Sequence, residues 1–105
     1  MAERWIAVAS PRDIPPGTAR VVQAGGRSLA VCNVDGQFFA VQNLCTHDGG
    51  PLGEGVLFGY AIECPRHGAR FDVRTGAVLA LPAVRPIQTF KTRIQGDKIE
   101  VALPD

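Results

Sequence analysis

The hydrophobic and polar positions of this chain form short runs separated by turn residues, a pattern that indicates β-strands. We expect strands at residues 4–10, 19–24, 27–34, 37–44, 87–94 and 98–103, and no segment predicts a convincing helix. Asp35-Gly36 and Gln95-Gly96-Asp97 lie between neighbouring strands and indicate hairpin turns. The two ends of the chain are therefore expected to be rich in antiparallel β-structure.

The middle of the chain, from about residue 43 to residue 81, has a different composition that is dense in glycine. The simplest architecture is all-β: an antiparallel β-sandwich or barrel with a small metal-binding subdomain inserted between its strands. The length of 105 residues and the lack of an internal repeat or linker predict a single domain over residues 1–105.

Charge and composition exclude several classes of function. The formal net charge is +1 and no run of Lys or Arg occurs, so nucleic-acid binding is not expected. The apolar stretches are too short for a membrane span, and residues 1–10 lack the long apolar segment of a secretory signal. We therefore expect a cytoplasmic protein. In that reducing compartment, cysteines more often bind metals than form disulfides.

Cysteine and histidine are concentrated in two short loops of the middle segment. Cys45 and His47 form a C-x-H pair, and Cys64 and His67 form a C-x-x-H pair after a spacer of sixteen residues. These four residues include both histidines and two of the three cysteines of the chain. Thiolate and imidazole suit iron, zinc or copper, whereas calcium and magnesium prefer oxygen ligands. The sequence therefore predicts a metal site formed by the two loops.

Two kinds of metal site compete for these four ligands. A Cys2His2 zinc site usually takes both cysteines from one knuckle and both histidines from a helix, whereas here each loop is mixed. In a Rieske-type [2Fe–2S] cluster, two thiolates hold one iron and two imidazoles hold the other. Mixed loops suit that arrangement, and glycines let backbone amides approach the sulfides. The remaining interpretation is that the two Cys-His pairs arose by chance. In that case, both histidines of the chain would lie in these pairs by coincidence.

The stretch CTHDGGPLGEG, followed after a few residues by IECPRHGARFDVRTGAVLALPA, closely resembles the Rieske signature. The similarity covers essentially the whole chain, and it is closest to the small soluble ferredoxins of bacterial ring-hydroxylating dioxygenase systems. The resemblance implies that Cys45 and Cys64 bind one iron and that His47 and His67 bind the other. It also implies that a third, proline-containing loop at about residues 81–83 covers the cluster.

The resemblance also separates this chain from the high-potential branch of the family, whose two loops are joined by a disulfide. Gly50 and Arg66 occupy those cysteine positions here, and Ala69 and Phe71 replace a Ser and a Tyr whose hydroxyls face the cluster sulfurs. Hydrogen bonds to the sulfurs stabilise the reduced state. Their loss predicts a reduction potential near the low end of the Rieske range, about −150 mV. The imidazole ligands predict a potential that depends on pH in alkaline solution.

The resemblance implies an electron carrier and not an enzyme. Single electrons would pass from an NAD(P)H-dependent flavin reductase to the terminal oxygenase of an aromatic-ring-hydroxylating system. The protein would be a monomer that docks transiently with each partner, and a near-neutral surface is compatible with such docking.

Three other functions compete with this assignment, and the histidine count excludes the second of them. The first is a small Rieske-like subunit of an assimilatory nitrite reductase, although many such subunits lack the four ligands. The second is the Rieske domain of an oxygenase, which would need a further two-histidine–carboxylate iron site for which the chain has no spare histidine. The third is a structural zinc module.

Overall fold

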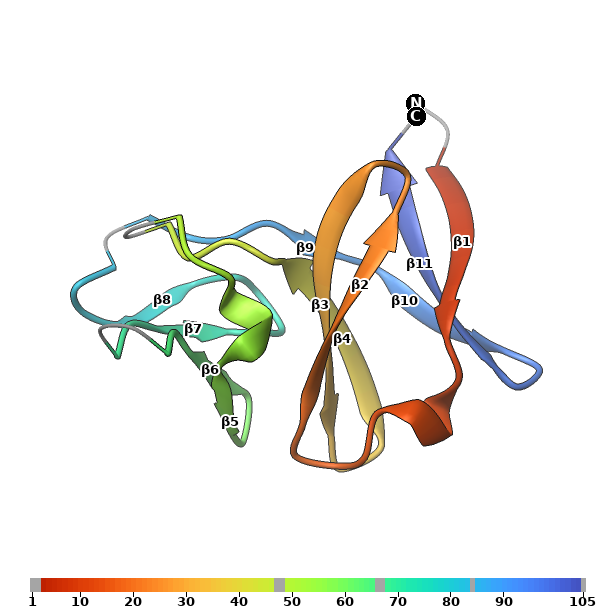
Figure 1. Ribbon diagram of the computed structural model, residues 1–105, viewed down its shortest axis with the longest axis horizontal. Coiled ribbons are helices and arrows are strands. Elements are labelled where there is room, and N and C mark those ends of the chain that lie inside the picture. Colours follow the sequence, from red (N-terminus) through yellow and green to blue (C-terminus); the bar gives the residue numbers. More distant parts are fainter. Residues whose placement is uncertain (1–2, 47–48, 66–67, 84, 105) are drawn as a thin grey trace.

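The computed structural model of the protein describes residues 3–46, 49–65, 68–83 and 85–104. These residues form eleven strands in three antiparallel sheets (Figure 1). The helices found in them are two single 3-10 turns, η1 (Pro11–Asp13) and η2 (Leu52–Glu54). Within these ranges, no helix has the length and apolar character that a membrane span requires.

Two of the sheets pack against each other as a β-sandwich. The strand order is β1-β11-β10 in the first sheet and β2-β3-β4-β9 in the second. Their bounds are β1 (Glu3–Ala9), β2 (Ala19–Ala24), β3 (Arg27–Val34), β4 (Gln37–Gln42), β9 (Thr89–Phe90), β10 (Thr92–Gln95) and β11 (Lys98–Pro104). Buried aliphatic side chains of β3 and β11 fill the space between the sheets. Strand β1 pairs with β11, which brings the two ends of the chain side by side (Figure 1).

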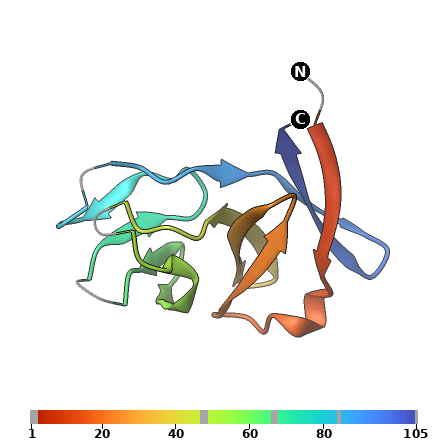
Figure 2. The same ribbon diagram turned by 45° about the horizontal axis from the view of Figure 1, so that its top comes forward.

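The third sheet is a compact insert between β4 and β9, with strand order β5-β6-β7-β8. Its strands are β5 (Val56–Phe58), β6 (Ala61–Glu63), β7 (Arg70–Asp72) and β8 (Val78–Ala80). Figures 1 and 2 both place this insert at one end of the molecule and the β10–β11 hairpin at the other. The inserted subdomain expected at about residues 43–81 is therefore a small antiparallel sheet with its connecting loops.

Strand β3 is the middle layer of the molecule, because both of its faces are buried. All six residues from Leu29 to Val34 are inaccessible. Leu29 and Val31 point into the sandwich core, whereas Ala30, Cys32 and Val34 belong to the core that the second sheet shares with the insert. Burial of both faces explains why five of these six residues are apolar, since neither face of the strand meets water. The sixth, Asn33, is buried with its side-chain amide donating to the Ile14 carbonyl.

The strand predictions are confirmed for the sandwich, where every expected segment contains a strand. The segment 87–94 is divided into β9 and β10, and the segment 37–44 ends as a strand at Gln42. The four insert strands were not predicted individually. Each spans only three residues, which is too short for alternation to be recognised.

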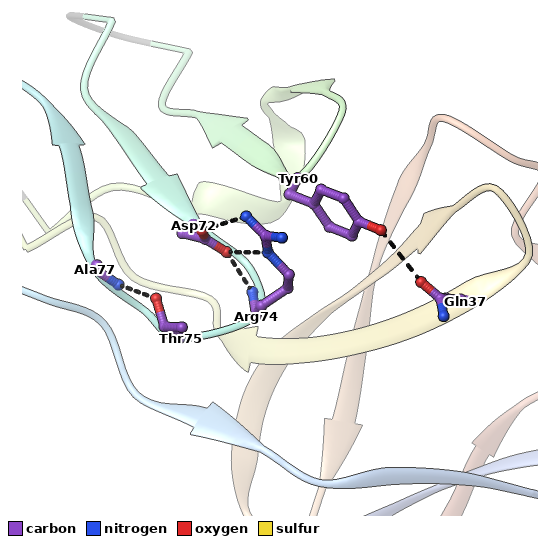
Figure 3. Close-up of polar contacts among 6 residues, drawn as sticks. All are labelled: Gln37, Tyr60, Asp72, Arg74, Thr75 and Ala77. Atoms are coloured by element: carbon purple, nitrogen blue, oxygen red, sulfur yellow. Dashed lines mark hydrogen bonds and ion pairs between the residues drawn. The ribbon is translucent and has the colours of Figure 1, made fainter.

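The insert is joined to the sandwich by an aromatic contact at the turn between β5 and β6. The ring of Tyr60 meets the ring of Phe39 on β4 edge-on, with centroids 5.9 Å apart. Its hydroxyl donates a long hydrogen bond of 3.4 Å to the side chain of Gln37 (Figure 3). On the insert side, the guanidinium of Arg74 lies 3.9 Å from the Tyr60 ring centroid and is held by the carboxylate of Asp72. These contacts fix the insert against the sheet from which it emerges.

Candidate metal centre

The two cysteines predicted as ligands lie in the loops that the insert and the sandwich bring together. Cys45 follows the end of β4, and Cys64 directly follows β6. Both side chains are buried, with 0% and 1% exposure. The predicted histidine ligands, His47 and His67, lie outside the described residues.

The Cys45 loop, residues 43–50, closes on itself through two backbone hydrogen bonds. The Cys45 amide donates to the Gly50 carbonyl at 2.9 Å, and the Gly49 amide donates back to the Cys45 carbonyl at 2.7 Å. Gly49 has a φ of 77°, in the left-handed region that glycine adopts at little cost. The thiol-bearing residue is therefore held at the base of a tight turn.

The Cys64 loop, residues 64–69, repeats this arrangement with different residues. The Cys64 amide donates to the Ala69 carbonyl at 2.7 Å, and the Gly68 amide donates to the Cys64 carbonyl at 3.3 Å. Gly68 also has a left-handed φ, of 80°. In each loop the cysteine therefore pairs with the residues four and five positions later. The backbone around the cysteine is therefore hydrogen-bonded in the same way in both loops. The histidine follows the cysteine by two positions in the first loop and by three in the second.

Packing brings the two loops toward one another. Cys45, Cys64 and Leu52 belong to one buried cluster. Leu52 begins η2, just after the Cys45 loop, and Gly55 follows the last residue of η2. A Cβ on Gly55 would collide with the carbonyl of Glu63, the residue before Cys64. Only glycine allows the chain leaving the first loop to pass so close to the chain entering the second.

Asn43 secures the start of the Cys45 loop. Its side-chain amide donates to the Ser28 hydroxyl on β3 at 3.0 Å, and its side-chain oxygen accepts from the Gly53 amide at 2.6 Å. One side chain thus links β3 and η2 across the base of the loop. This role of Asn43 was not predictable from the sequence, because its spatial neighbours are not its neighbours along the chain.

The third loop was expected at about residues 81–83, and the residues that continue it, Arg85 and Pro86, lie against the Cys45 loop. The Thr46 hydroxyl donates to the Arg85 carbonyl at 2.6 Å. Ala83 is buried in the cluster that contains both cysteines, whereas Leu81 is 76% exposed. A pocket of about 390 Å³ lies between the two loops, lined by Leu44, Cys45, Thr46, Gly49, Arg85 and Pro86. The structure therefore places the predicted third loop beside the Cys45 loop, with a hydrophobic side chain facing solvent.

Cys32 differs from the other two cysteines in position and in acid–base chemistry. It lies in the middle of β3 with no exposed surface. Burial raises the pKa of the Cys32 thiol to about 12, because a thiolate there would be deprived of solvation. Cys32 therefore packs as a small hydrophobic residue of the core. No disulfide joins any of the three cysteines, all of which the structure describes.

Three of the four positions that distinguish the branches of the Rieske family are described, and all three are buried. Ala69 and Phe71 have no exposed surface and pack in the same cluster as Cys45 and Cys64. Neither side chain carries a hydrogen-bond donor. Gly50 is buried within the Cys45 loop, and Arg66 lies outside the described residues. In its described part, the surroundings of the cysteines are therefore apolar.

The described part of the site fits an iron–sulfur cluster. It offers two buried sulfur atoms, not engaged in disulfides, from two equivalent loops that share one core. Soft thiolate donors of this kind select iron–sulfur clusters, zinc or copper over hard cations. Gly49 and Gly68 have left-handed φ values that let each loop turn tightly around such a cluster.

The comparisons with known proteins assign the family. The family model of the Rieske [2Fe-2S] domain matches residues 4–91. The ferredoxin component of the naphthalene 1,2-dioxygenase system of Pseudomonas aeruginosa is 39% identical over 103 residues, which cover 98% of this chain and 99% of that protein. Sequence identity therefore extends over nearly the full length of both proteins.

Solved structures agree with this assignment. One similar structure is the complex of reduced oxygenase and oxidized ferredoxin in carbazole 1,9a-dioxygenase. Its matching chain is 39% identical to this chain, with a TM-score of 0.88. The match covers 93% of this chain and 92% of that one. A structure described as a putative NADH-dependent nitrite reductase small subunit from Mycobacterium tuberculosis has a TM-score of 0.89, covering 100% and 99% of the two chains. Its identity is only 21%, so it shares the fold alone. The chain belongs to the Rieske [2Fe-2S] domain family and is one of its ferredoxins, with a Rieske-type [2Fe–2S] cluster as cofactor.

Proposed function

We propose that this ferredoxin carries single electrons from an NAD(P)H-dependent flavin reductase to the terminal oxygenase of an aromatic-ring-hydroxylating system. The observation that carries the proposal is full-length similarity to a ferredoxin component of a naphthalene dioxygenase system. The similarity to the ferredoxin chain in the carbazole dioxygenase complex supports an oxygenase as the electron acceptor. The protein works as a cytoplasmic monomer, folded as one domain over residues 1–105.

The cluster ligands in this proposal are Cys45 and Cys64 on one iron and His47 and His67 on the other. The equivalent hydrogen-bonded frames of the two loops support this pairing, because each loop then contributes one thiolate to the same iron. When bound, the cluster supplies a one-electron couple. The chain holds the two thiolates in place, keeps water from them by burial, and exposes a face to which partners can dock.

The low potential expected from the sequence belongs to the same proposal. Ala69 and Phe71 line the buried cluster of residues around the cysteines without donating a hydrogen bond from their side chains. Fewer donors to sulfur leave the reduced state less stabilised, which makes the protein a stronger reductant. A strong reductant suits delivery of electrons to an oxygenase better than it suits quinol oxidation.

Membership of a nitrite reductase is the less favoured alternative. It is supported by similarity of fold at 21% identity, whereas the dioxygenase ferredoxins are similar in sequence over nearly the whole chain. The predicted ligand set also favours a cluster-bearing carrier, since Cys45 and Cys64 are buried at the meeting point of two loops.

Anaerobically purified protein tests the proposal. We expect about two irons and two acid-labile sulfides per chain. The chemically reduced protein should then transfer its electron to an aromatic-ring-hydroxylating oxygenase in a stopped-flow experiment. NADH or NADPH with a flavin reductase should reduce the oxidised protein. Protein with an intact cluster that exchanges electrons with no such reductase or oxygenase, but supports nitrite reduction, would contradict the assignment.

A further inference from the structure

The Arg85 side chain is a cation placed beside the Cys45 loop. Its backbone carbonyl accepts a hydrogen bond of 2.6 Å from the Thr46 hydroxyl, so the residue is anchored to the loop that bears the thiolate. The residue itself is exposed, and with Pro86 it forms one wall of the pocket of about 390 Å³ whose other wall includes Cys45. The backbone of Arg85 is therefore held beside the Cys45 loop, and its exposed side chain places a positive charge next to the metal centre.

Arg85 differs in its pairing from three other arginines of the protein. Arg70, Arg74 and Arg93 each form an ion pair with a carboxylate, at 2.7 to 2.9 Å. Over the described ranges of the chain, no acidic side chain lies within ion-pair distance of the Arg85 guanidinium. Its charge is therefore available to a carboxylate of another molecule.

Apolar side chains accompany this charge. Leu44, which lines the same pocket, is 40% exposed, and Leu81 at the start of the third loop is 76% exposed. Exposed leucines next to a single unneutralised arginine have the composition of a small interface, in which apolar contact gives affinity and charge gives orientation. A partner that binds here approaches the metal centre, as electron transfer requires.

We propose that Arg85 receives a carboxylate of the terminal oxygenase when the two proteins dock, so that the oxygenase presents an acidic side chain beside an apolar patch. This inference rests on the proposed function and adds the sign of the charge on the partner. A guanidinium binds a carboxylate through two parallel hydrogen bonds, which fixes orientation as well as attraction. In a transient complex, such a contact acts mainly on the association rate.

The test compares two substitutions that change the charge equally. Arg85→Glu changes the formal net charge from +1 to −1, because one positive charge is replaced by one negative charge. Lys98→Glu makes the same change at an exposed position of the β10–β11 hairpin, at the opposite end of the molecule from the insert (Figure 2). Arg85→Gln removes the charge while keeping a long polar side chain. Each variant is first checked for cluster absorbance and midpoint potential.

The measurement is the second-order rate constant of electron transfer from the reduced variant to the oxidised oxygenase that accepts electrons from the wild type. At low ionic strength we expect Arg85→Glu to lower this constant about tenfold, and Arg85→Gln to lower it by less. Lys98→Glu should change it by less than about twofold, and high salt should bring Arg85→Glu close to the wild type.

Four outcomes would overturn the inference. They are equal rates for Arg85→Glu and Lys98→Glu, a faster reaction of Arg85→Glu, a defect that does not change with salt, and a defect confined to reduction by the flavin reductase. A wild-type protein that transfers electrons to no oxygenase would instead contradict the proposed function. The two failures are therefore distinguishable.

Discussion

The ring of Tyr60 meets the ring of Phe39 at an interplanar angle of 80°, with the centroids 5.9 Å apart. Tyr60 belongs to the insert and Phe39 to β4 of the sandwich, so the pair bridges the two parts of the protein. The Tyr60 carbonyl also accepts a hydrogen bond from the Val73 amide at 2.9 Å, which ties the β5–β6 turn to the end of β7. The Tyr60 side chain thus helps to hold the insert in its orientation.

Replacing Tyr60 by Ala is expected to lower the free energy of unfolding by about 2 kcal/mol, through lost apolar burial and a lost edge-to-face pair. Tyr60→Phe should cost less than about 0.5 kcal/mol, because it keeps the ring and removes only an exposed hydrogen bond of 3.4 Å. Denaturant unfolding measures both variants. Equal losses would mean that the hydroxyl, and not the ring, connects the insert to the sandwich.

Acid should weaken the same junction through Asp72. Hydrogen bonds from the Arg74 side chain lower the pKa of Asp72 below its ordinary value of 3.8. The resulting stabilisation is fully present above that value and is lost as the pH falls through the lower pKa of the folded state. Asp72→Asn should therefore lower the melting temperature by a few degrees at pH 7.

The difference between wild type and Asp72→Asn should shrink as the pH falls below about 4. Asp97→Asn, in the exposed turn between β10 and β11, serves as the matched control and should follow the wild type at every pH. Melting curves of the three proteins between pH 7 and pH 3 give the comparison. A difference that stays constant or widens in acid would rule out the ion pair as its source.

Hydroxyl groups introduced near the cysteines should raise the reduction potential. Ala69→Ser and Phe71→Tyr restore, by resemblance, the donors of the high-potential branch at two buried positions. A hydrogen bond to sulfur worth about 1 kcal/mol in the reduced state corresponds to about 40 mV in a one-electron couple. Protein-film voltammetry measures the midpoint of each variant. An unchanged or lower midpoint in both would mean that the added hydroxyls do not reach the sulfurs.

The three cysteines should respond differently to substitution. Cys45→Ala and Cys64→Ala are expected to abolish the cluster, because each removes a proposed thiolate ligand. Cys32→Ala should retain it, with a loss of stability of about 1 kcal/mol from the small cavity in the core. The iron content, the acid-labile sulfide content and the visible absorption spectrum of each variant show whether it retains the cluster. Loss of the cluster from Cys32→Ala with an intact fold would revise the ligand set.

Anchoring of the third loop can be tested at Thr46. Thr46→Val keeps the shape of the side chain and removes the hydrogen bond to the Arg85 carbonyl, leaving that carbonyl without its donor. We expect faster loss of the cluster absorbance in air than in the wild type, by about threefold to tenfold for a bond worth about 1 kcal/mol. Thr46→Ser keeps the hydroxyl and should restore the wild-type rate. Equal lifetimes for the Val and Ser variants would show that the bond does not protect the centre.

The sandwich strands and the identity of the cofactor were predictable from local sequence. Segments of six to eight residues that are rich in apolar side chains and bounded by turn residues define β2, β3 and β4. The spacing of Cys45, His47, Cys64 and His67 predicts the Rieske cluster, because the ligand types and their order can be seen within two short segments of the sequence. The comparisons confirm the family and the cofactor, whereas the four ligands remain a prediction.

Tertiary structure alone decided how the site is held together. Thr46 and Arg85 are 39 residues apart, and Gln42 and Gln88, whose hydrogen bonds of 2.6 and 2.9 Å close the base of the insert, are 46 apart. The register of four three-residue strands likewise depends on which neighbours they meet. Ligand type is a property of single residues, which the sequence states directly. Contacts between distant segments arise only when the whole chain has packed, so no local pattern records them.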